Sequence, residues 1–208
     1  MFKSIVSLLA LASVAFAAPS ASFEKRVDFP GPHPPGFDIT SVSFLGIGCP
    51  PGSTYYFLSP DKTTVIVEFT ELFAEAGPGV PISRNRRACQ LSFDVNVPAG
   101  FTFGVATVDY RGYYQLDSKV TGSQQFTFYF QGKTDLATAR STLTGPAGGD
   151  YTFRDAFDLT VTSPCGSGTV LKVNSEIRVS NSANTQAFGY FSTDSILTLG
   201  LQWRTCET

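Results

Sequence analysis

Apolar side chains recur at every second position through much of this 208-residue sequence, and this alternation constrains the fold more than any other feature. In residues 91–97, for example, the order is Leu, Ser, Phe, Asp, Val, Asn, Val. A period of two is typical of a strand with one face buried and the other in solvent. The same alternation occurs at 126–130 and 197–203. Comparable runs lie at 39–47, 63–73, 101–116, 151–162, 170–179 and 187–192.

Turn-forming residues separate these runs, as expected for many short strands. They include Pro50-Pro51-Gly52, Ser59-Pro60-Asp61, Pro98-Ala99-Gly100, Gly145-Pro146, Gly148-Gly149 and residues 180–184. Pro98-Ala99-Gly100 joins two alternating runs, so this short loop predicts a β-hairpin. Residues 69–76 have the one helix-like pattern, but the β-branched run 63–67 before them favours strand. The sequence therefore predicts an all-β fold, an antiparallel β-sandwich that is jelly-roll-like and has about nine or ten strands.

The first residues have the order of a secretory signal peptide. Lys3 gives a basic start, an apolar run follows from 5 to 16, and Ala15-Phe16-Ala17 is a small-x-small cleavage motif. The apolar run is shorter than the roughly 20 residues that span a bilayer. We therefore expect cleavage of residues 1–17 after Ala17, and secretion into the extracellular space without a membrane anchor.

A second processing site can follow at Lys25 and Arg26, a dibasic pair that suits subtilisin-type proteases of the secretory pathway. The alternative is that two solvated charges are simply adjacent. Residues 29–36 contain four prolines and two glycines, a composition that favours extended polyproline conformation. We therefore expect residues 18–36 to be a propeptide-like, Pro-rich leader and residues 37–208 to be a single β-sandwich domain.

The sequence has four cysteines, Cys49, Cys89, Cys165 and Cys206. In an exported chain they favour two disulfides, and the wide spacings without C-x-x-C argue against a zinc or redox motif. Three pairings are possible. We favour Cys49 with Cys89 and Cys165 with Cys206, because each bond then joins strands within one half of the chain, although the other pairings stay open. A closed loop of about 40 residues contributes about 4 kcal/mol in the chain-entropy model.

Charge and histidine content exclude several functions. With 15 Lys+Arg against 17 Asp+Glu, the chain has no broad positive field, so we expect no nucleic-acid partner. The single histidine, His33, lies in the Pro-rich leader, where no packed element holds it for general-base catalysis. This argues against His-dependent serine triads, nucleases and zinc sites. We assign no catalytic residue, no cofactor and no metal, and we expect a monomer with no membrane partner after signal removal.

Carboxylate pairs remain the one catalytic option, because glycoside hydrolysis needs only two acids at a set separation across a groove. Nothing in their spacing distinguishes one pair, and Asp150, Asp155 and Asp158 match no calcium-binding loop. The candidates are Glu68, Glu71, Glu75, Asp94, Asp109, Asp117, Asp150, Asp155, Asp158 and Glu176.

The densest polar and aromatic segment is 109–117, with the sequence Asp-Tyr-Arg-Gly-Tyr-Tyr-Gln-Leu-Asp. Its tyrosines can stack on sugar rings while Arg and Asp side chains bind hydroxyls. The favoured alternative is an ordinary strand with a bulge at Gly112, in which Arg111 pairs with Asp109 or Asp117. The candidate ligand surface consists of Asp109, Arg111, Tyr113, Tyr114 and Asp117.

Two further features have structural interpretations. Arg84-Asn85-Arg86-Arg87 forms a basic loop, for which a solvated turn is favoured over a phosphate site. Trp203 is in phase with Leu199 and Leu201, which favours core packing over ligand stacking.

Seven short motifs follow one another along the chain. They are Gly48-Cys49-Pro50-Pro51-Gly52-Ser53, Cys89-Gln90-Leu91, Val97-Pro98-Ala99-Gly100-Phe101, Asp109-Tyr110-Arg111-Gly112, Phe130-Gln131-Gly132, Ser163-Pro164-Cys165-Gly166 and Trp203-Arg204-Thr205-Cys206. In order and spacing they resemble the secreted fungal and bacterial family called domain of unknown function 4360, over nearly all of 37–206. Ile47 departs from the small hydroxyl residue expected before Gly48. The resemblance implies a small secreted β-rich domain with two disulfides, and with the dibasic pair it suggests a filamentous fungus. It transfers no catalytic residues.

These features predict a secreted, non-enzymatic surface module that binds a cell-wall glycan or a host or competitor protein. Two alternatives stay open. One is a carboxylate-dependent, polysaccharide-active enzyme. The other is a secreted effector, toxin or inhibitor that is recognised through its loops.

Overall fold

The structure is a computed structural model that describes residues 34–194 and 197–206. All of these residues belong to the unit Gly31–Thr208. Within them, no helix is both long enough and apolar enough to cross a membrane. Outside the described residues lie the expected signal peptide with its cleavage site at Ala17, the dibasic pair Lys25 and Arg26, and the single histidine His33.

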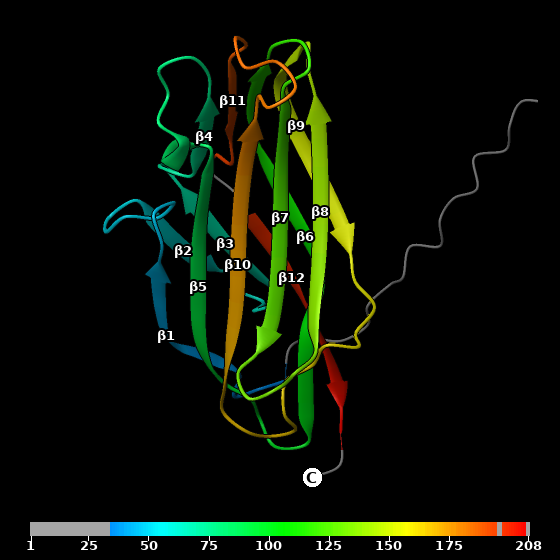
Figure 1. The fold of residues 1–208 in the computed structure, drawn as a ribbon. Coiled ribbons are helices and arrows are strands. Elements are labelled where there is room, and N and C mark those ends of the chain that lie inside the picture. The colour runs from blue at the N-terminus through cyan, green and yellow to red at the C-terminus, as the bar shows by residue number, and fades with distance from the viewer. Residues whose placement is uncertain (1–33, 195–196, 207–208) are drawn as a thin grey trace, which may run out of the picture. The chain divides into compact units, whose positions relative to one another are not determined.

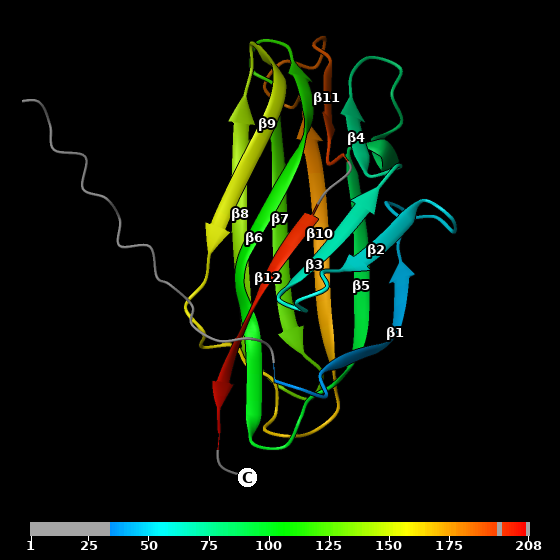
Figure 2. The ribbon, with the colours of Figure 1, turned by 180° about the vertical axis from the view of Figure 1, so that it is seen from behind.

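Twelve strands form two antiparallel sheets that pack face to face (Figure 1 and Figure 2). The five-stranded sheet has the order β1 (Asp38–Leu45), β5 (Arg86–Asn96), β10 (Thr169–Ser180), β7 (Thr121–Phe130) and β8 (Leu136–Thr144). The seven-stranded sheet has the order β2 (Thr54–Leu58), β3 (Thr64–Phe69), β12 (Leu197–Thr205), β6 (Phe101–Leu116), β11 (Gly189–Ser192) and β4 (Phe73–Ala76), and β9 (Ala147–Ala156) pairs with β6. The one helix in the described ranges is the 3-10 turn η1 (Ile82–Arg84). The predicted all-β antiparallel sandwich is confirmed.

The structure has twelve strands where the alternation predicts about nine or ten. The run 63–73 divides into β3 and β4, because the chain turns at Glu71, whose carbonyl oxygen accepts a bond from Phe73 N. The other two additional strands lie at the edges of their sheets. β2 has three consecutive aromatic residues and no polar alternation, and Leu143 is the one large apolar side chain that β8 turns inward.

The loop Pro98-Ala99-Gly100 is not a hairpin, so this prediction is wrong. It joins β5 to β6, which belong to different sheets, and the chain crosses from one layer to the other. Alternation cannot separate the two cases, because both kinds of strand bury one face. The loops that do connect paired neighbours join β2 to β3 and β7 to β8.

The expected strand 151–162 ends early, because β9 stops at Ala156. The chain then follows the edge of β6 through separate bonds, among them Phe157 N to Ala106 O at 2.8 Å and Ser163 N to Phe103 O at 2.8 Å. Leu159 and Val161 in this segment are buried. A Cβ atom on Gly104 would lie 2.6 Å from the carbonyl oxygen of Val161, so this segment covers the outer face of β6 near its start.

Large apolar side chains fill the space between the sheets. Each contributes about 1.5–3 kcal/mol when it is fully buried. Phe37, where we expect the domain to begin, is 1% exposed, and its ring lies 4.5 Å from that of Trp203 and 5.5 Å from that of Phe103. Trp203 is partly buried and packs against the core, as its phase predicts. The other fully buried phenylalanines include Phe93, Phe126, Phe128, Phe130 and Phe191.

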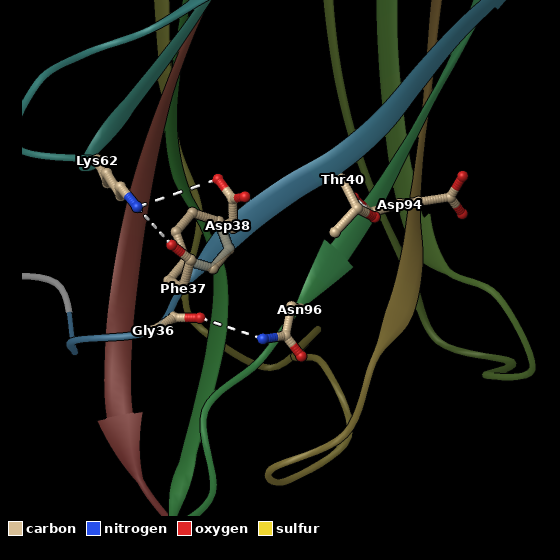
Figure 3. A network of polar contacts seen from close by, with 7 residues as sticks. All are labelled: Gly36, Phe37, Asp38, Thr40, Lys62, Asp94 and Asn96. Carbon is tan, nitrogen blue, oxygen red and sulfur yellow. Dashed lines mark hydrogen bonds and ion pairs between the residues drawn. The ribbon is translucent and has the colours of Figure 1, made fainter.

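Polar contacts fix the backbone on either side of Phe37 (Figure 3). Lys62 Nζ donates to the carbonyl oxygen of Phe37 at 2.7 Å, and Asn96 Nδ2 donates to that of Gly36 at 3.2 Å. The longer ion pair between Lys62 and Asp38, at 4.0 Å, is exposed and contributes little. These contacts hold the start of β1 across the ends of both sheets.

The four cysteines form the pairing that we favour among the three possible. Cys49 is joined to Cys89, with Cα atoms 5.4 Å apart, and Cys165 is joined to Cys206, with Cα atoms 6.0 Å apart. The first bond ties the loop after β1 to β5, and the second ties the segment before β10 to the end of β12.

Candidate functional site

The structure separates the residues of the candidate ligand surface between the two faces of β6. Asp109, Arg111 and Tyr113 alternate on the outer face, and Tyr113 is 39% exposed. Tyr114 lies on the inner face, where it packs against the core with its ring 6.3 Å from that of Tyr151. Adjacent residues of a strand point to opposite sides, so Tyr113 and Tyr114 do not form one platform. Tyr114 is therefore removed from the candidate surface.

The expected internal tie of Arg111 to Asp109 or Asp117 is absent from the described residues. Asp109 pairs instead with Arg154 on β9, at 3.4 Å. Asp117 accepts a bond from the backbone N–H of Phe188 at 2.8 Å. Gly112 is not a bulge either, because β6 and β9 pair in regular register from Thr107 to Leu116. Arg111 is left exposed among outward polar residues.

Three aromatic side chains from three neighbouring strands form a row on the outer face of the seven-stranded sheet. Phe73 on β4 is stacked on Tyr190 of β11, with ring centroids 5.9 Å apart and an interplanar angle of 21°. The Tyr190 ring lies 6.4 Å from that of Tyr113 on β6. We call Phe73, Tyr190 and Tyr113 the aromatic row. Beyond Tyr113, the next strand places Asp150 directly opposite.

A depression of about 200 Å³ lies beside Tyr190. Its apolar wall comes from Phe188, which is 52% exposed, and from Val80 and Tyr190. Its polar wall consists of the carboxylates of Glu75 and Asp117 and the amide of Gln115. A hollow with apolar sides and a few converging polar groups is the usual form of a small-ligand site.

The Tyr190 hydroxyl has an acidic environment. Partial burial raises the pKa of Tyr190, and the nearby carboxylates of Asp194, Glu75 and Glu71 raise it further, whereas a bond with Ser192 acts in the opposite direction. The phenol is therefore held in its neutral form and keeps its O–H available as a donor.

A bend after β11 holds the end of that strand against β6, beside the aromatic row. Asp194 N donates to the carbonyl oxygen of Arg111 at 3.0 Å, and Ser192 Oγ lies 3.3 Å from both N and O of Tyr113. This approach requires glycine at 112, because a Cβ atom there would lie 1.9 Å from the carbonyl oxygen of Ser192. Gly112 therefore lets Tyr113 and Tyr190 lie close together.

A buried polar network lies directly beneath this bend. The Tyr151 hydroxyl lies 2.8 Å from both the Ser192 carbonyl oxygen and Gln124 Oε1, and Thr193 Oγ1 lies 2.8 Å from the same Gln124 oxygen. Both hydroxyls are satisfied if Tyr151 donates to Ser192 O and Thr193 donates to Gln124 Oε1. Gln124 also reaches Ser175 Oγ at 3.5 Å. These bonds connect the site to the five-stranded sheet behind it.

Among the candidate carboxylates, Glu75 and Asp117 are the two that share the depression. Both already have partners, because Glu75 accepts a bond from Arg84 at 2.9 Å and Asp117 accepts the bond from Phe188 N. Asp155 instead accepts a bond from Tyr110 at 2.7 Å on the inner face. Within the described residues, no group of three or more His, Cys, Asp or Glu side chains is arranged to hold a metal ion.

The arginines of the basic loop at 84–87 form contacts with other residues of the protein. Arg86 forms a two-bond pair with Glu176, at 2.7 and 2.5 Å, which raises the pKa of Arg86. Arg87 donates to the carbonyl oxygen of Ile47 at 3.2 Å. With Arg84 paired to Glu75, these arginines are engaged in structural contacts.

Sequence reasoning missed Tyr190, Phe73 and Phe188. Tyr190 and Phe73 alternate correctly within their strands, but the signal that unites them with Tyr113 is the register of β4, β11 and β6. A second group of exposed aromatic residues, Tyr55 and Phe57, lies on β2 at the other edge of the same sheet.

Comparison with known proteins gives one family and one relative. The model of the family described as Domain of unknown function (DUF4360) matches residues 35–206. A protein of Arthroderma benhamiae, described as an uncharacterized secreted protein, is 34% identical over 204 residues, which cover 91% of this chain and 83% of that protein.

Two solved structures are matched over most of this chain. TmCBM61 in complex with beta-1,4-galactotriose has 9% identity and a TM-score of 0.27, over 81% of this chain and 91% of that chain. The enzymatically active domain of bacteriophage CBA120 tailspike protein 4 has 11% identity and a TM-score of 0.28, over 81% of this chain and 20% of that chain. At TM-scores this low, neither structure bears on the ligand of this protein.

The family match covers most of the chain, and the relative matches 91% of the chain. With two disulfides and a secreted relative, the protein is an extracellular one. The chain belongs to the DUF4360 family.

Proposed function

We propose that this DUF4360 protein is a non-enzymatic glycan-binding module, and that its sugar-binding surface is the aromatic row with the adjacent depression. The observation that carries this proposal is the meeting of Phe73, Tyr190 and Tyr113 on three neighbouring strands. Aromatic faces stack on the apolar faces of sugar rings, while polar groups beside them bind the ring hydroxyls.

The depression supports the same ligand class. Glu75, Asp117 and Gln115 offer acceptors and one amide donor beside the ring of Tyr190. Sugar hydroxyls act both as donors and as acceptors, so they match this mixture of groups. The apolar wall formed by Phe188 and Val80 suits the edge of a pyranose ring.

The negative charge of this surface favours neutral glycans over anionic ones. Carboxylates outnumber cations there, and two of the three arginines, Arg84 and Arg154, already pair with acids. An anionic polysaccharide would meet like charge, so we propose a neutral glycan as the ligand. The carboxylates are Glu71, Glu75, Asp109, Asp117, Asp150 and Asp194, and the third arginine is Arg111.

The test is binding of the secreted protein to insoluble chitin and β-glucan and to a glycan array, followed by titration with soluble oligomers. Tyr190→Ala and Tyr113→Ala should each weaken binding about fivefold or more, because one stacked ring is worth on the order of 1 kcal/mol or more. Tyr129→Ala is the matched control, since Tyr129 lies on the outer face of the other sheet. Absence of binding to every neutral glycan would overturn the proposal.

A second candidate function is polysaccharide hydrolysis, because Glu75 and Asp117 line the same depression. This reaction requires one carboxylic acid that carries a proton and a second carboxylate. Release of reducing ends by the wild-type protein, and its loss in Glu75→Gln and Asp117→Asn, would establish an enzyme. Binding without any product is the outcome that we expect.

A further inference from the structure

The outer face of the five-stranded sheet has a second depression, of about 160 Å³, in a region that the proposed function does not involve. Its walls come from three neighbouring strands, β10, β7 and β8. Four hydroxyl side chains and two guanidinium groups line it, namely Thr121, Ser123, Thr142, Ser180, Arg140 and Arg178. We infer that this depression binds a tetrahedral oxyanion, a sulfate or phosphate group.

The register of the strands places the two arginines on one outer face, on either side of β7. Arg178 lies opposite Ser123 on β7, and Ser123 lies opposite Thr142 on β8. Arg140 is two residues from Thr142 on the same strand, so it points outward on the same face. Strands lie about 4.8 Å apart, and two long arginine side chains span that separation from either side of β7.

These two guanidinium groups are unpaired within the described part of the chain. Of the eight arginines there, five have a hydrogen bond or ion pair: Arg84, Arg86, Arg87, Arg154 and Arg204. Two of the remaining three, Arg140 and Arg178, line the same depression. On the outer faces of β10, β7 and β8 the single acidic residue is Glu176, and it already binds Arg86 through both of its oxygens.

The donors favour a tetrahedral dianion over a carboxylate. Two guanidinium forks carry two positive charges and bind oxyanions through parallel N–H bonds, and the neighbouring hydroxyls add donors. A carboxylate has one negative charge and two oxygen atoms, which leaves part of this donor set unused. Sulfate and phosphate have more oxygens and up to two charges, so they match it.

The source of the anion is either the free ion or an ester on a polymer, and the experiment separates them. Inorganic sulfate and inorganic phosphate are titrated into the secreted protein by calorimetry, at constant ionic strength set with chloride. Dextran sulfate is then compared with uncharged dextran. Binding of the free ions assigns a free-ion site, whereas binding of dextran sulfate alone assigns an ester group.

Arg140→Ala and Arg178→Ala should each weaken oxyanion binding about tenfold, because each removes a charge-assisted two-bond contact. Lys133→Ala is the matched control: it removes the same charge from an exposed residue after β7, outside the depression, and should leave the affinity unchanged. Arg178→Lys keeps the charge but loses the planar fork, so it should bind more weakly than wild type.

Two results would overturn this inference. One is that neither free ion nor dextran sulfate binds to the wild-type protein. The other is that Lys133→Ala weakens binding as much as Arg140→Ala does, since the attraction would then be unspecific. Neither result depends on the proposed glycan site, which lies on the other sheet.

Discussion

The two ends of the space between the sheets are filled by different kinds of side chain. At one end, Phe37, Phe103, Phe130 and Trp203 pack ring against ring, with centroids 4.5–5.5 Å apart. We call this the phenylalanine end. At the other end, beneath the candidate site, the polar end consists of Tyr110, Gln124, Tyr151, Ser175 and Thr193, and hydroxyl and amide groups there bond to each other or to near neighbours.

The phenylalanine end contributes mainly to the stability of the fold, whereas the polar end contributes mainly to the position of the candidate site. Apolar contacts at the phenylalanine end add free energy of folding but have little directional preference. A buried hydrogen bond adds only about 0.5–1.5 kcal/mol net, yet leaving its partner unsatisfied costs about 1–3 kcal/mol. The bond from Tyr151 to the Ser192 carbonyl oxygen and the bond from Thr193 to Gln124 therefore fix how the two sheets sit behind the bend at Ser192. The candidate site therefore lies over the end of the interior that is held by directional hydrogen bonds.

The largest expected effect is the loss of a ring at the phenylalanine end. Phe103 is 1% exposed and contacts Phe37, Phe130 and Trp203. Phe103→Ala should lower the free energy of unfolding by about 3–5 kcal/mol, because it removes a buried ring and leaves a cavity. The measurement is denaturant unfolding followed by fluorescence of Trp203, the one tryptophan of the chain.

The control for this change is Phe57→Ala, which removes the same side chain from β2, where it is 54% exposed. It should change the free energy of unfolding by about 0.5 kcal/mol or less. If the two variants lose equal stability, the phenylalanine end is not the main apolar anchor of the fold.

Alkaline pH should act on the polar end. Burial raises the pKa of both Tyr151 and Tyr110, so their neutral forms are favoured in the folded protein. The stability they contribute is fully present below the unfolded pKa of about 10 and is lost as pH rises towards the folded pKa. Each tyrosine should cost about 1.4 kcal/mol for every pH unit in that window. Denaturant unfolding at pH 9 and pH 11 measures this loss, and Tyr151→Phe should remove the share of the loss that Tyr151 contributes.

At neutral pH, Tyr151→Phe tests a single member of the network. The change keeps the ring, which stacks on Phe191 at 4.9 Å, but removes the bond to the Ser192 carbonyl oxygen. The free energy of unfolding should fall by about 1–2 kcal/mol, because that buried acceptor loses its partner. Phe153→Leu is the comparison, because it changes ring packing beside Tyr151 on the same strand without removing a hydrogen bond. If the free energy of unfolding did not change, the hydrogen bond of the Tyr151 hydroxyl would not stabilise the fold.

The sequence predicts strands well where one face is continuously buried. The bounds of β6, 101–116, are those that the sequence predicts, and its alternation changes phase only where β12 shifts register between Gly200 and Leu201. β2 and β8 escape detection because they are edge strands, whose exposed side chains carry little of that pattern. The crossing at 98–100 is misjudged because alternation records burial and not the partner strand.

The candidate site is harder to predict from the sequence than the strands are. Tyr113 stands out in a polar aromatic segment, whereas Tyr114 belongs inside by the same period of two that defines the strand. Tyr190 comes from a strand more than 70 positions away and reaches Tyr113 through the pairing of β11 with β6. That register depends on long-range packing, which one sequence does not reveal.

Apart from the Phe57→Ala control, the smallest expected effect on stability is at Ser192, which links the polar end to the aromatic row. Ser192 is 3% exposed, so it does not reach a ligand, yet its hydroxyl lies 2.7 Å from Asp194 Oδ1 and 3.3 Å from Tyr113 N. Ser192→Ala should lower the free energy of unfolding by about 1 kcal/mol or less. It should weaken binding of the glycan that wild type retains by about threefold to tenfold, because Tyr113 and Tyr190 lose a common support.

Phe103→Leu is the opposing control for Ser192→Ala. It keeps an apolar side chain at the far end, lowers stability by more than Ser192→Ala does, and should leave the glycan Kd within about twofold of wild type. Calorimetric Kd values and unfolding free energies for both variants give two ratios of affinity loss to stability loss. Equal ratios would mean that the polar end supports the fold as a whole and has no special part in positioning the aromatic row. A larger ratio for Ser192→Ala is expected, because its bonds end on the backbone that carries Tyr113.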